Sequence, residues 1–217
     1  MRPLSKVKIT WSPDFAYAIG LITTDGSLSK DERHISFTSK DLELIRNLLY
    51  SLRIHCHIGR KASSSQPRKK YYTVQIGDVL FYNFLLSIGL MPNKTKIVGA
   101  LHIPEKYFFD FLRGHLDGDG TFYSYWDPRW KFSFMFYTVF ASASKGHILW
   151  LRDTILRLAN ARGHITKAQT QSCYQLKYAK SASLRLLKKL YYSSAAISLI
   201  RKHLKIKKAL AIIGESL

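Results

Sequence analysis

The chain has 217 residues, 47% of them hydrophobic and 13% aromatic, which is enough apolar material for a folded core and argues against disorder. Its 34 Lys and Arg against 14 Asp and Glu give a formal charge of +20, which favours a polyanionic partner, nucleic acid above all. Two cysteines argue against a disulfide framework and fit an intracellular, reducing setting, the cytoplasm of a prokaryote or an organelle. The longest mostly apolar run, 79–91, is too short to span a bilayer, so we expect no membrane partner.

The first predicted helix covers residues 13–24. Ser12 and Pro13 are a typical N-cap and first-turn pair, and apolar residues follow at helical spacing. After Gly26 we expect a hairpin whose return strand is 35–39, because apolar and polar residues alternate there. An amphipathic helix is expected at 41–52.

A second hairpin is predicted from strands 54–59 and 71–76, with the basic, serine-rich stretch 60–70 between them. A helix at 78–88 and a basic turn at 91–96 follow. His55, Cys56 and His57 have no second ligand pair at zinc-finger spacing, so we do not expect a structural zinc ion.

The second half of the chain repeats this plan. Its predicted elements are a helix at 104–116, a long hairpin with return strand 132–137, a helix at 148–160, strands 164–169 and 173–178, and a basic helical tail from about residue 182. The sequence therefore predicts an α+β fold of two pseudo-symmetric αββαββα repeats, residues 1–100 and 101–217. Each repeat would contribute a four-stranded antiparallel sheet, and the pair of sheets could form a saddle over a duplex.

Two stretches break the rules of helix formation in the same way. Residues 18–26 read AIGLITTDG and residues 112–120 read LRGHLDGDG, and a constant offset of 94 matches Gly20 with Gly114 and Asp25 with Asp119. A glycine inside a helix costs about 0.5 to 1 kcal/mol relative to alanine, and an acid at the C-terminal end meets the negative pole of the helix dipole. Broken local rules of this kind often mark a functional site.

The glycines are explained if the two helices pack side by side, because a missing side chain lets the backbones approach. Asp25 and Asp119 would then lie next to each other, and two adjacent carboxylates repel unless a proton or a cation lies between them. Carboxylates suit Mg²⁺, which could activate a water and stabilise the leaving oxygen in phosphodiester hydrolysis. In the alternative interpretation the aspartates cap turns and the glycines end helices; the match at both places weakens it.

These stretches resemble the paired signatures of the LAGLIDADG homing endonucleases in their single-chain, two-repeat form, and the likeness extends over nearly the whole chain. The second copy is the stronger, since Thr23 stands in the first where the family often has an acid. The resemblance implies that Asp25, Asp119, Thr24 and Gly118 bind the cation, which is Mg²⁺ or, in its place, Mn²⁺ or Ca²⁺. It also implies sheets in the DNA major groove and cleavage of one strand per site, leaving short 3′ overhangs.

The same resemblance implies basic or polar residues around the metal site. Four candidates fall at similar points after the first hairpin of each repeat: Ser39, Lys40, Ser144 and Lys145. Lys94 resembles another such lysine, and its counterpart is either Lys202 or Lys205. For each lysine the alternative is a surface position that contacts only phosphate or water. Asp117 has no acidic counterpart in the first repeat, and we predict a structural role through a local hydrogen bond at the helix end.

Base reading requires polar side chains on the outward face of strands, because base edges in the major groove present hydrogen-bond donors and acceptors. A shift of one residue in register would move each candidate to the other face. The candidates from alternation are Ser36, Thr38, Thr73, Gln75, Ser133, Tyr137, Thr166, Gln175 and Lys177. A second, basic set is expected to contact phosphates, unless its loop is only a solvated tip: Arg60, Lys61, Arg68, Lys69 and Lys70.

The predicted function is a site-specific double-strand DNA endonuclease. We expect a monomer, because two repeats in one chain supply the dimer interface internally. The alternative is an intron RNA-splicing maturase of the same fold, whose partner would be intron RNA. A third possibility is a catalytically silent DNA-binding regulator. Both aspartates argue against it, because a protein that does not cleave DNA has no metal-binding reason to keep them.

Overall fold

A computed structural model describes residues 5–62, 70–130, 132–167 and 173–217. The chain forms two compact units, which we call the first unit (Met1–Lys94 with Leu101–Gly118) and the second unit (Thr95–Ala100 with Asp119–Leu217). These units differ from the two sequence repeats at two points, since residues 95–100 belong to the second unit and residues 101–118 to the first. The motif helix of the second repeat packs within the first unit, because it lies against the motif helix of the first repeat.

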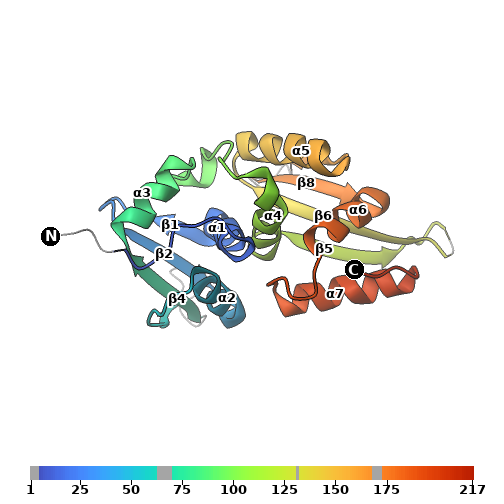
Figure 1. Ribbon diagram of the computed structural model, residues 1–217. Helices are drawn as coiled ribbons and strands as arrows, with labels where there is room; N and C mark the ends of the chain where they lie inside the picture. The colour runs from blue at the N-terminus through green and yellow to red at the C-terminus, as the bar shows by residue number, and fades with distance from the viewer. Residues whose placement is uncertain (1–4, 63–69, 131, 168–172) are drawn as a thin grey trace. The chain divides into compact units, whose positions relative to one another are not determined.

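The first unit contains one antiparallel sheet with strand order β1-β2-β4-β3 and helices on one of its faces (Figure 1). Strand pairing puts Ile35 opposite Ile76 and Phe37 opposite Val74, and all four are buried. Helices α1, α2 and α3 each contact β2. The elements are α1 (Pro13–Asp25), β1 (Gly26–Leu28), β2 (His34–Ser39), α2 (Leu42–Leu52), β3 (Gly59–Ala62), β4 (Lys70–Gly77), α3 (Val79–Ser87), η2 (Glu105–Tyr107) and α4 (Phe108–Asp117).

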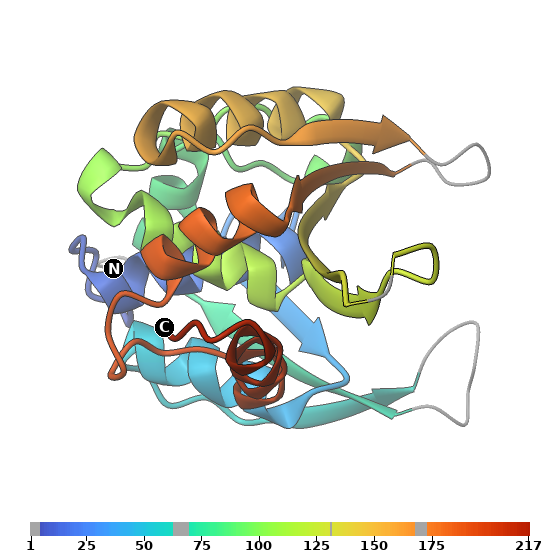
Figure 2. The ribbon, with the colours of Figure 1, turned by 90° about the vertical axis from the view of Figure 1, so that its right-hand side faces the viewer.

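The second unit repeats this arrangement with strand order β5-β6-β8-β7. Helices α5 and α6 both contact β6 and β8, and they cover the face that carries buried Phe136, Phe140 and Leu176 (Figure 2). The elements are β5 (Thr121–Trp126), β6 (Phe134–Ser142), α5 (Lys145–Ala159), β7 (His164–Lys167), β8 (Tyr174–Ala179), α6 (Lys180–Leu190) and α7 (Ile200–Ile212). The predicted fold of two αββαββα repeats, each with a four-stranded antiparallel sheet, is confirmed.

Side-chain caps fix where several helices begin. Ser12 accepts a hydrogen bond from the Phe15 amide, and Asp78 accepts one from the Phe81 amide. The other oxygen of Asp78 accepts from the amides of Lys6 and Val7 at 2.6 and 2.8 Å, which ties the N-terminal segment to the start of α3. Within the described residues, no helix has the length and apolar character needed to cross a membrane.

Several predicted elements have different bounds in the structure; helix α4 begins at Phe108 where 104 was predicted, and α5 begins at Lys145 where 148 was predicted. The strand predicted at 54–59 begins only at Gly59, because the Ile54 amide bonds to Leu49 O and the chain leaves α2 through a left-handed Arg53. Phe132 was predicted within a strand, but it is 92% exposed in a left-handed conformation, and β6 begins at Phe134. The basic tail is two helices, α6 and α7, and the predicted strand end at 168–169 lies outside the described residues.

Helices α1 and α4 approach most closely at Gly20 and Gly114. A Cβ added to Gly20 would overlap the Phe111 carbonyl oxygen and lie 2.8 Å from the His115 amide nitrogen. A Cβ added to Gly114 would overlap the Tyr17 carbonyl oxygen and lie 3.1 Å from the Leu21 amide nitrogen. Backbone atoms cannot yield as a flexible side chain does, so this packing requires glycine at both positions.

We therefore expect Gly20→Ala to lower the free energy of unfolding by about 1 to 3 kcal/mol, the range for overpacking a core. Urea denaturation measures the change. Gly99→Ala is the matched control, since an added Cβ there would meet no atom within 4 Å. We expect that control to leave stability unchanged or slightly higher, because it removes chain entropy only from the unfolded state. Equal stability of the Gly20 variant and wild type would contradict the packing argument.

Candidate functional site

Three of the predicted metal ligands lie together in the first unit, at the C-terminal end of α1. A Cβ on Gly118 would overlap the Thr24 hydroxyl and lie 2.9 Å from a carboxylate oxygen of Asp25. The Thr24 hydroxyl donates to Leu21 O at 2.8 Å and lies 3.3 Å from the Asp25 carboxylate. Glycine at 118 therefore lets the chain after α4 pass close to Thr24 and the Asp25 carboxylate.

The fourth predicted ligand, Asp119, follows Gly118 in the chain and belongs to the second unit. It is exposed, and its carboxylate lies near Cys173. Burial, with a smaller contribution from the negative charge of Asp119, raises the pKa of the Cys173 thiol. The thiol is therefore protonated and neutral at neutral pH.

Lys94 delivers a positive charge to the same end of α1. Only 7% of this residue is exposed, and Nζ donates to Gly26 O at 2.5 Å and to Thr24 O at 3.4 Å. Those two carbonyls flank Asp25 in the chain. An ammonium at the C-terminal end of a helix is favourable, because it faces the negative pole of the helix dipole.

The second unit contains the same arrangement around Gly120, which follows Asp119 as Gly26 follows Asp25. Lys202 of α7 donates from Nζ to Gly120 O at 2.7 Å. Of the two candidates that the sequence left open, Lys202 and not Lys205 is therefore the counterpart of Lys94. Sequence spacing could not decide this, because Lys94 comes from η1 (Lys94–Lys96) whereas Lys202 comes from a long helix.

The lysines after the first hairpins do not occupy equivalent positions. Asp41 is the N-cap of α2 and Ser144 is the N-cap of α5, so the caps align Lys40 with Ala143. Lys145 is the first residue of α5 and is exposed. Lys40 is also exposed, and its Nζ lies 5.5 Å from the ring centre of Tyr71.

The serines after the first hairpins show the same offset between the two repeats. The Ser39 hydroxyl accepts from the Asp41 amide at 3.1 Å, and the Ser142 hydroxyl accepts from the Ser144 amide at 3.1 Å. Ser142 is therefore the counterpart of Ser39. Ser144 is buried and donates to Val98 O, so its side chain serves the helix cap and this contact.

Asp117 takes part in a buried polar network between α1 and α4. The Tyr17 hydroxyl donates to Asp117 at 2.8 Å, so the prediction of a local helix-end bond is wrong and the partner lies on the other motif helix. Burial, together with the charge of Asp117, raises the pKa of Tyr17 well above its usual value. Arg113 pairs with Asp110 at 2.8 Å, and its guanidinium lies 5.6 Å from the Tyr17 ring centre.

All four base-reading candidates of the first unit lie on the open face of its sheet, opposite the helices. Ser36 pairs with Gln75 and Thr38 pairs with Thr73, and the two threonine hydroxyls are 3.1 Å apart. The pairing adds two residues to this face that the sequence analysis missed, Ser27 and His34, and places Lys61, which was predicted as a phosphate contact, on the same face.

The described residues among the predicted phosphate contacts of the first unit do not all lie on the same face of the sheet. Lys61 pairs with Tyr71 on the open face, whereas Arg60 pairs with Tyr72 on the other face and lies 5.7 Å from its ring centre. Lys70 is the first residue of β4. Arg68 and Lys69 lie outside the described residues.

The open face of the second sheet carries four of the five candidates there: Tyr137, Thr166, Gln175 and Lys177. Ser133 precedes β6, and its amide donates to Trp130 O within the turn. Tyr123 and Tyr125 share the face with Tyr137, and the sequence analysis missed both. Alternation along the β5 segment TFYSYW was the signal that could have found them.

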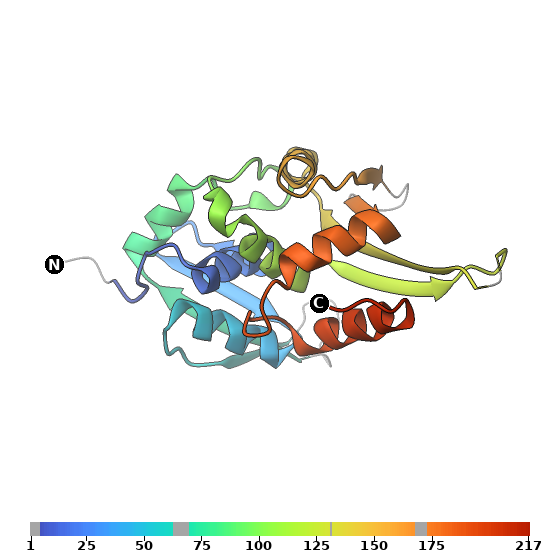
Figure 3. The ribbon, with the colours of Figure 1, turned by 45° about the vertical axis from the view of Figure 1, so that its right-hand side comes forward.

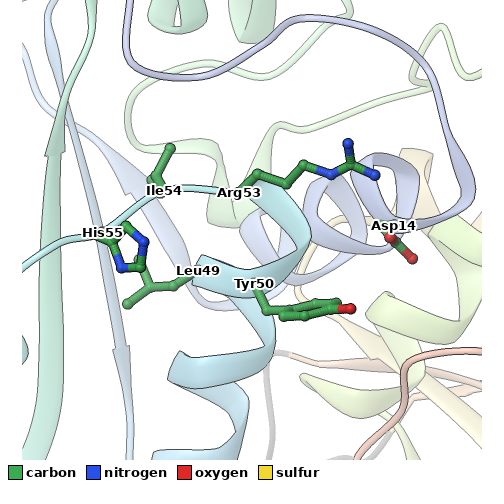
Figure 4. A pocket seen from close by; sticks show the side chains of 6 residues that line it. All are labelled: Asp14, Leu49, Tyr50, Arg53, Ile54 and His55. Atoms are coloured by element: carbon green, nitrogen blue, oxygen red, sulfur yellow. The ribbon is translucent and has the colours of Figure 1, made fainter.

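A separate hollow of about 390 Å³ lies beside the C-terminal end of α2 (Figure 4). No predicted site residue lines it. Its walls carry one acid, one guanidinium, one imidazole and apolar groups, and they are formed by Asp14, Leu49, Tyr50, Arg53, Ile54 and His55.

The donor chemistry around Asp25 fits a hard cation. Among the described residues, no group of three or more His, Cys, Asp or Glu side chains could hold a metal ion. Mg²⁺ does not require such a cage, since it keeps several waters and binds one or two carboxylates together with substrate phosphate. The Asp25 carboxylate and the Thr24 hydroxyl, 3.3 Å apart, are oxygen donors that fit that mode of binding.

Comparison with known families gives a match within the first repeat. Residues 12–89 match the family model of the LAGLIDADG-like domain. The match falls on the repeat whose motif has Thr23 in place of an acid. No curated protein matches the chain.

Solved structures extend the likeness to both repeats. The chain is similar to the homing endonuclease I-WcaI bound to its DNA recognition sequence, with 14% identity, a TM-score of 0.64, and coverage of 92% of this chain and 88% of that one. The chain is also similar to I-DmoI in complex with DNA and Mn, with 16% identity, a TM-score of 0.53, and coverage of 83% of this chain and 97% of that one. The chain therefore has the LAGLIDADG homing endonuclease fold in its single-chain, two-repeat form.

The fold also occurs outside proteins described as endonucleases. Full-length DUF199/WhiA from Thermatoga maritima is similar to this chain, with 14% identity, a TM-score of 0.56, and coverage of 95% of this chain and 69% of that one. It is described by its LAGLIDADG domain. Fold alone therefore does not decide whether a LAGLIDADG protein cuts DNA, and the residues of the site carry that question.

The buried bond between Tyr17 and Asp117 gives a stability prediction. Tyr17→Phe keeps the ring but removes the donor, so we expect the free energy of unfolding to fall by about 1 to 3 kcal/mol. Because the pKa of Tyr17 is raised in the folded state, its contribution is complete below pH 10 and is lost as the pH rises above that value.

Thermal denaturation at pH 7 and at pH 10.5 tests both statements. The variant should be less stable than wild type at pH 7, and the difference should shrink at pH 10.5. Tyr50→Phe is the control, because Tyr50 is 70% exposed and its change should stay within about 0.5 kcal/mol. A Tyr17 variant as stable as wild type at pH 7 would show that the bond contributes nothing.

Proposed function

We propose that this protein is a site-specific double-strand DNA endonuclease that uses a divalent cation to hydrolyse phosphodiesters. One observation carries the proposal. In both repeats an aspartate at the end of the motif helix is followed by a glycine whose carbonyl accepts a hydrogen bond from a lysine ammonium. At such a turn the carboxylate provides a ligand for a cation and the ammonium provides a contact for phosphate. Cleavage of both DNA strands needs this pair of groups twice.

Each residue has a role in this proposal. Asp25, with Thr24 and Gly118 beside it, and Asp119 each provide a carboxylate ligand for a cation, and a bound cation supplies Lewis-acid activation of water and of the scissile phosphate. Structures of I-DmoI with DNA in the presence of Mn, Mg or Ca support a divalent ion here. Lys94 and Lys202 place positive charge where negative charge develops on the phosphate. Lys40 and Lys145 contact the DNA backbone.

The rest of the surface supports duplex DNA as the substrate. A net charge of +20 favours phosphate binding, with an affinity that falls steeply with salt. The open faces of the two sheets present hydroxyl, amide, imidazole and amino groups of the kind that reads base edges in the major groove. I-WcaI and I-LtrWI, which share the fold, are bound to DNA targets. The protein acts as a monomer, since one chain provides both repeats.

The first test is cleavage of a randomised duplex library with Mg²⁺ and, in parallel, with EDTA, followed by sequencing of the ends. Staggered, metal-dependent cuts at one long site would support the endonuclease. Duplex binding without cutting would favour a silent DNA-binding protein. Preference for the encoding intron RNA over duplex DNA at fixed salt would favour the maturase.

Charge removal tests the two aspartates separately. We expect Asp25→Asn and Asp119→Asn each to lower the cleavage rate by roughly 10²- to 10³-fold, the loss that follows removal of one electrostatic contribution to a transition state. Duplex affinity measured in EDTA should remain. Asp14→Asn, at the other end of α1, is the control and should cut normally. Full activity of either Asn variant would remove that aspartate from the mechanism.

A paired substitution on α7 tests the second lysine. We expect Lys202→Met to lower the cleavage rate by about 10- to 100-fold, because the charge at Gly120 O is lost. Lys205→Met removes the same charge from an exposed position on the same helix. Single-turnover rates at saturating enzyme separate cleavage from binding. Similar rates for the two variants would show that Lys202 is only one of many surface charges.

A further inference from the structure

Three tyrosines form a stacked cluster on the open face of the second sheet, which we call the tyrosine patch: Tyr123, Tyr125 and Tyr137. The rings of Tyr123 and Tyr137 are 5.2 Å apart at 16°, and those of Tyr125 and Tyr137 are 6.3 Å apart at 3°. Strand pairing puts Tyr123 opposite Tyr137 and Tyr125 opposite Met135. The patch is therefore a layer of parallel rings backed by β5 and β6.

This patch is not part of the core of its unit. The buried residues Phe122 and Phe136 alternate with the tyrosines along the same strands and face the helices. Tyr125 is 40% exposed, and the β5–β6 hairpin extends past the helices of its unit (Figure 3). An exposed cluster of large apolar rings is a typical mark of a binding surface.

The corresponding face of the first sheet has different chemistry. Gly26 aligns with Gly120 and the strand pairs follow, so His34 takes the position of Tyr137, and Ser29 takes that of Tyr123. The open face around His34 carries Ser36, Thr38 and Gln75, which are small or amide side chains. The first sheet therefore offers mainly hydrogen-bonding groups, whereas the second adds a flat aromatic surface to its polar residues.

Hydroxyl groups of the tyrosine patch form a hydrogen bond within the patch. The Tyr125 hydroxyl takes part in a hydrogen bond with Tyr137, and burial together with this bond raises the pKa of Tyr137. Tyr137 is therefore uncharged at neutral pH. Beyond the tyrosines, Arg129 donates from Nε and Nη2 to Asp127 at 3.1 and 2.9 Å, which fixes the turn of the hairpin.

We propose that the tyrosine patch reads thymine methyl groups in the half of the target duplex that the second sheet covers. Thymine presents a C5-methyl group in the major groove, the one apolar feature among the base edges there, and side chains read it by apolar contact. Parallel rings provide that contact, and a cytosine at the same place carries only a hydrogen at C5, so the methyl contact is lost. This inference rests on the duplex-binding part of the proposed function.

Deoxyuridine tests the inference, since it differs from thymidine only by the missing methyl. The selected target is prepared with deoxyuridine in place of thymidine in one half at a time, and the dissociation constant is measured in EDTA at fixed salt. We expect substitution in one half to weaken binding by about 3- to 10-fold per methyl contacted. Substitution in the other half should change affinity less than twofold.

Two variants connect that loss to the patch. Tyr125→Ser removes the ring from an exposed position, and we expect it to bind the thymidine and deoxyuridine duplexes equally at the sensitive half. Tyr125→Phe keeps the ring and should keep the penalty for deoxyuridine. Ser36→Ala on the first sheet is the matched control and should also keep it. Circular dichroism and thermal denaturation establish that each variant is folded.

The outcomes separate this inference from the proposed function. Tight binding and cleavage with no deoxyuridine penalty in either half would overturn the tyrosine patch as a methyl reader and leave the endonuclease intact. An undiminished penalty in folded Tyr125→Ser would overturn it equally. Binding without cleavage, with a penalty that depends on Tyr125, would support the patch and count against the endonuclease. No binding to any duplex would overturn both.

Discussion

The rest of the structure depends on the contact of backbone with backbone between α1 and α4 at Gly20 and Gly114. A single added methyl at either glycine would overlap a carbonyl oxygen of the opposite helix, so the two helices have one register in which they can pack. That register also brings Gly118 against Thr24 and Asp25. The close contact beside the Asp25 carboxylate is thus set by helix packing four or five residues away along each helix.

Buried charge restricts the same interface further. Arg113 and Asp110 form an ion pair with almost no exposure, and Tyr17 donates to buried Asp117 across the helices. Taking such groups out of water is costly, and losing one partner would leave an uncompensated charge, so they tolerate only the arrangement in which each is satisfied. The network therefore fixes the end of α4, from which Gly118 and Asp119 continue. Lys94 and Lys202 offset the unfavourable position of the aspartates near the negative pole of a helix.

Local patterns in the sequence predicted most of the elements because their causes are local. Ser12 caps the first helix as expected, and Asp41 and Asp78 cap two further helices at the places where the predicted helices begin. Alternation gave the correct face for Ser36, Thr38, Thr73 and Gln75, because that pleat has no bulge. The misses have long-range causes. Tyr17 and Asp117 are 100 residues apart, and Lys202 and Gly120 are 82 apart, so no spacing rule relates them. The start of β3 depends on its pairing with β4, which the sequence of β3 does not contain.

The two repeats keep the same elements and strand order but differ in the chemistry of their open faces. Packing explains this difference. Gly20, Gly114 and the residues around them are held by contacts that a substitution would break, whereas Ser36 or Tyr137 stands on a face that no helix covers. A symmetric homodimer presents the same surface twice and so matches a palindromic site. A single chain with two repeats has no such restriction, because each sheet can change alone. Polar groups on one sheet and stacked tyrosines on the other are what an asymmetric target would favour.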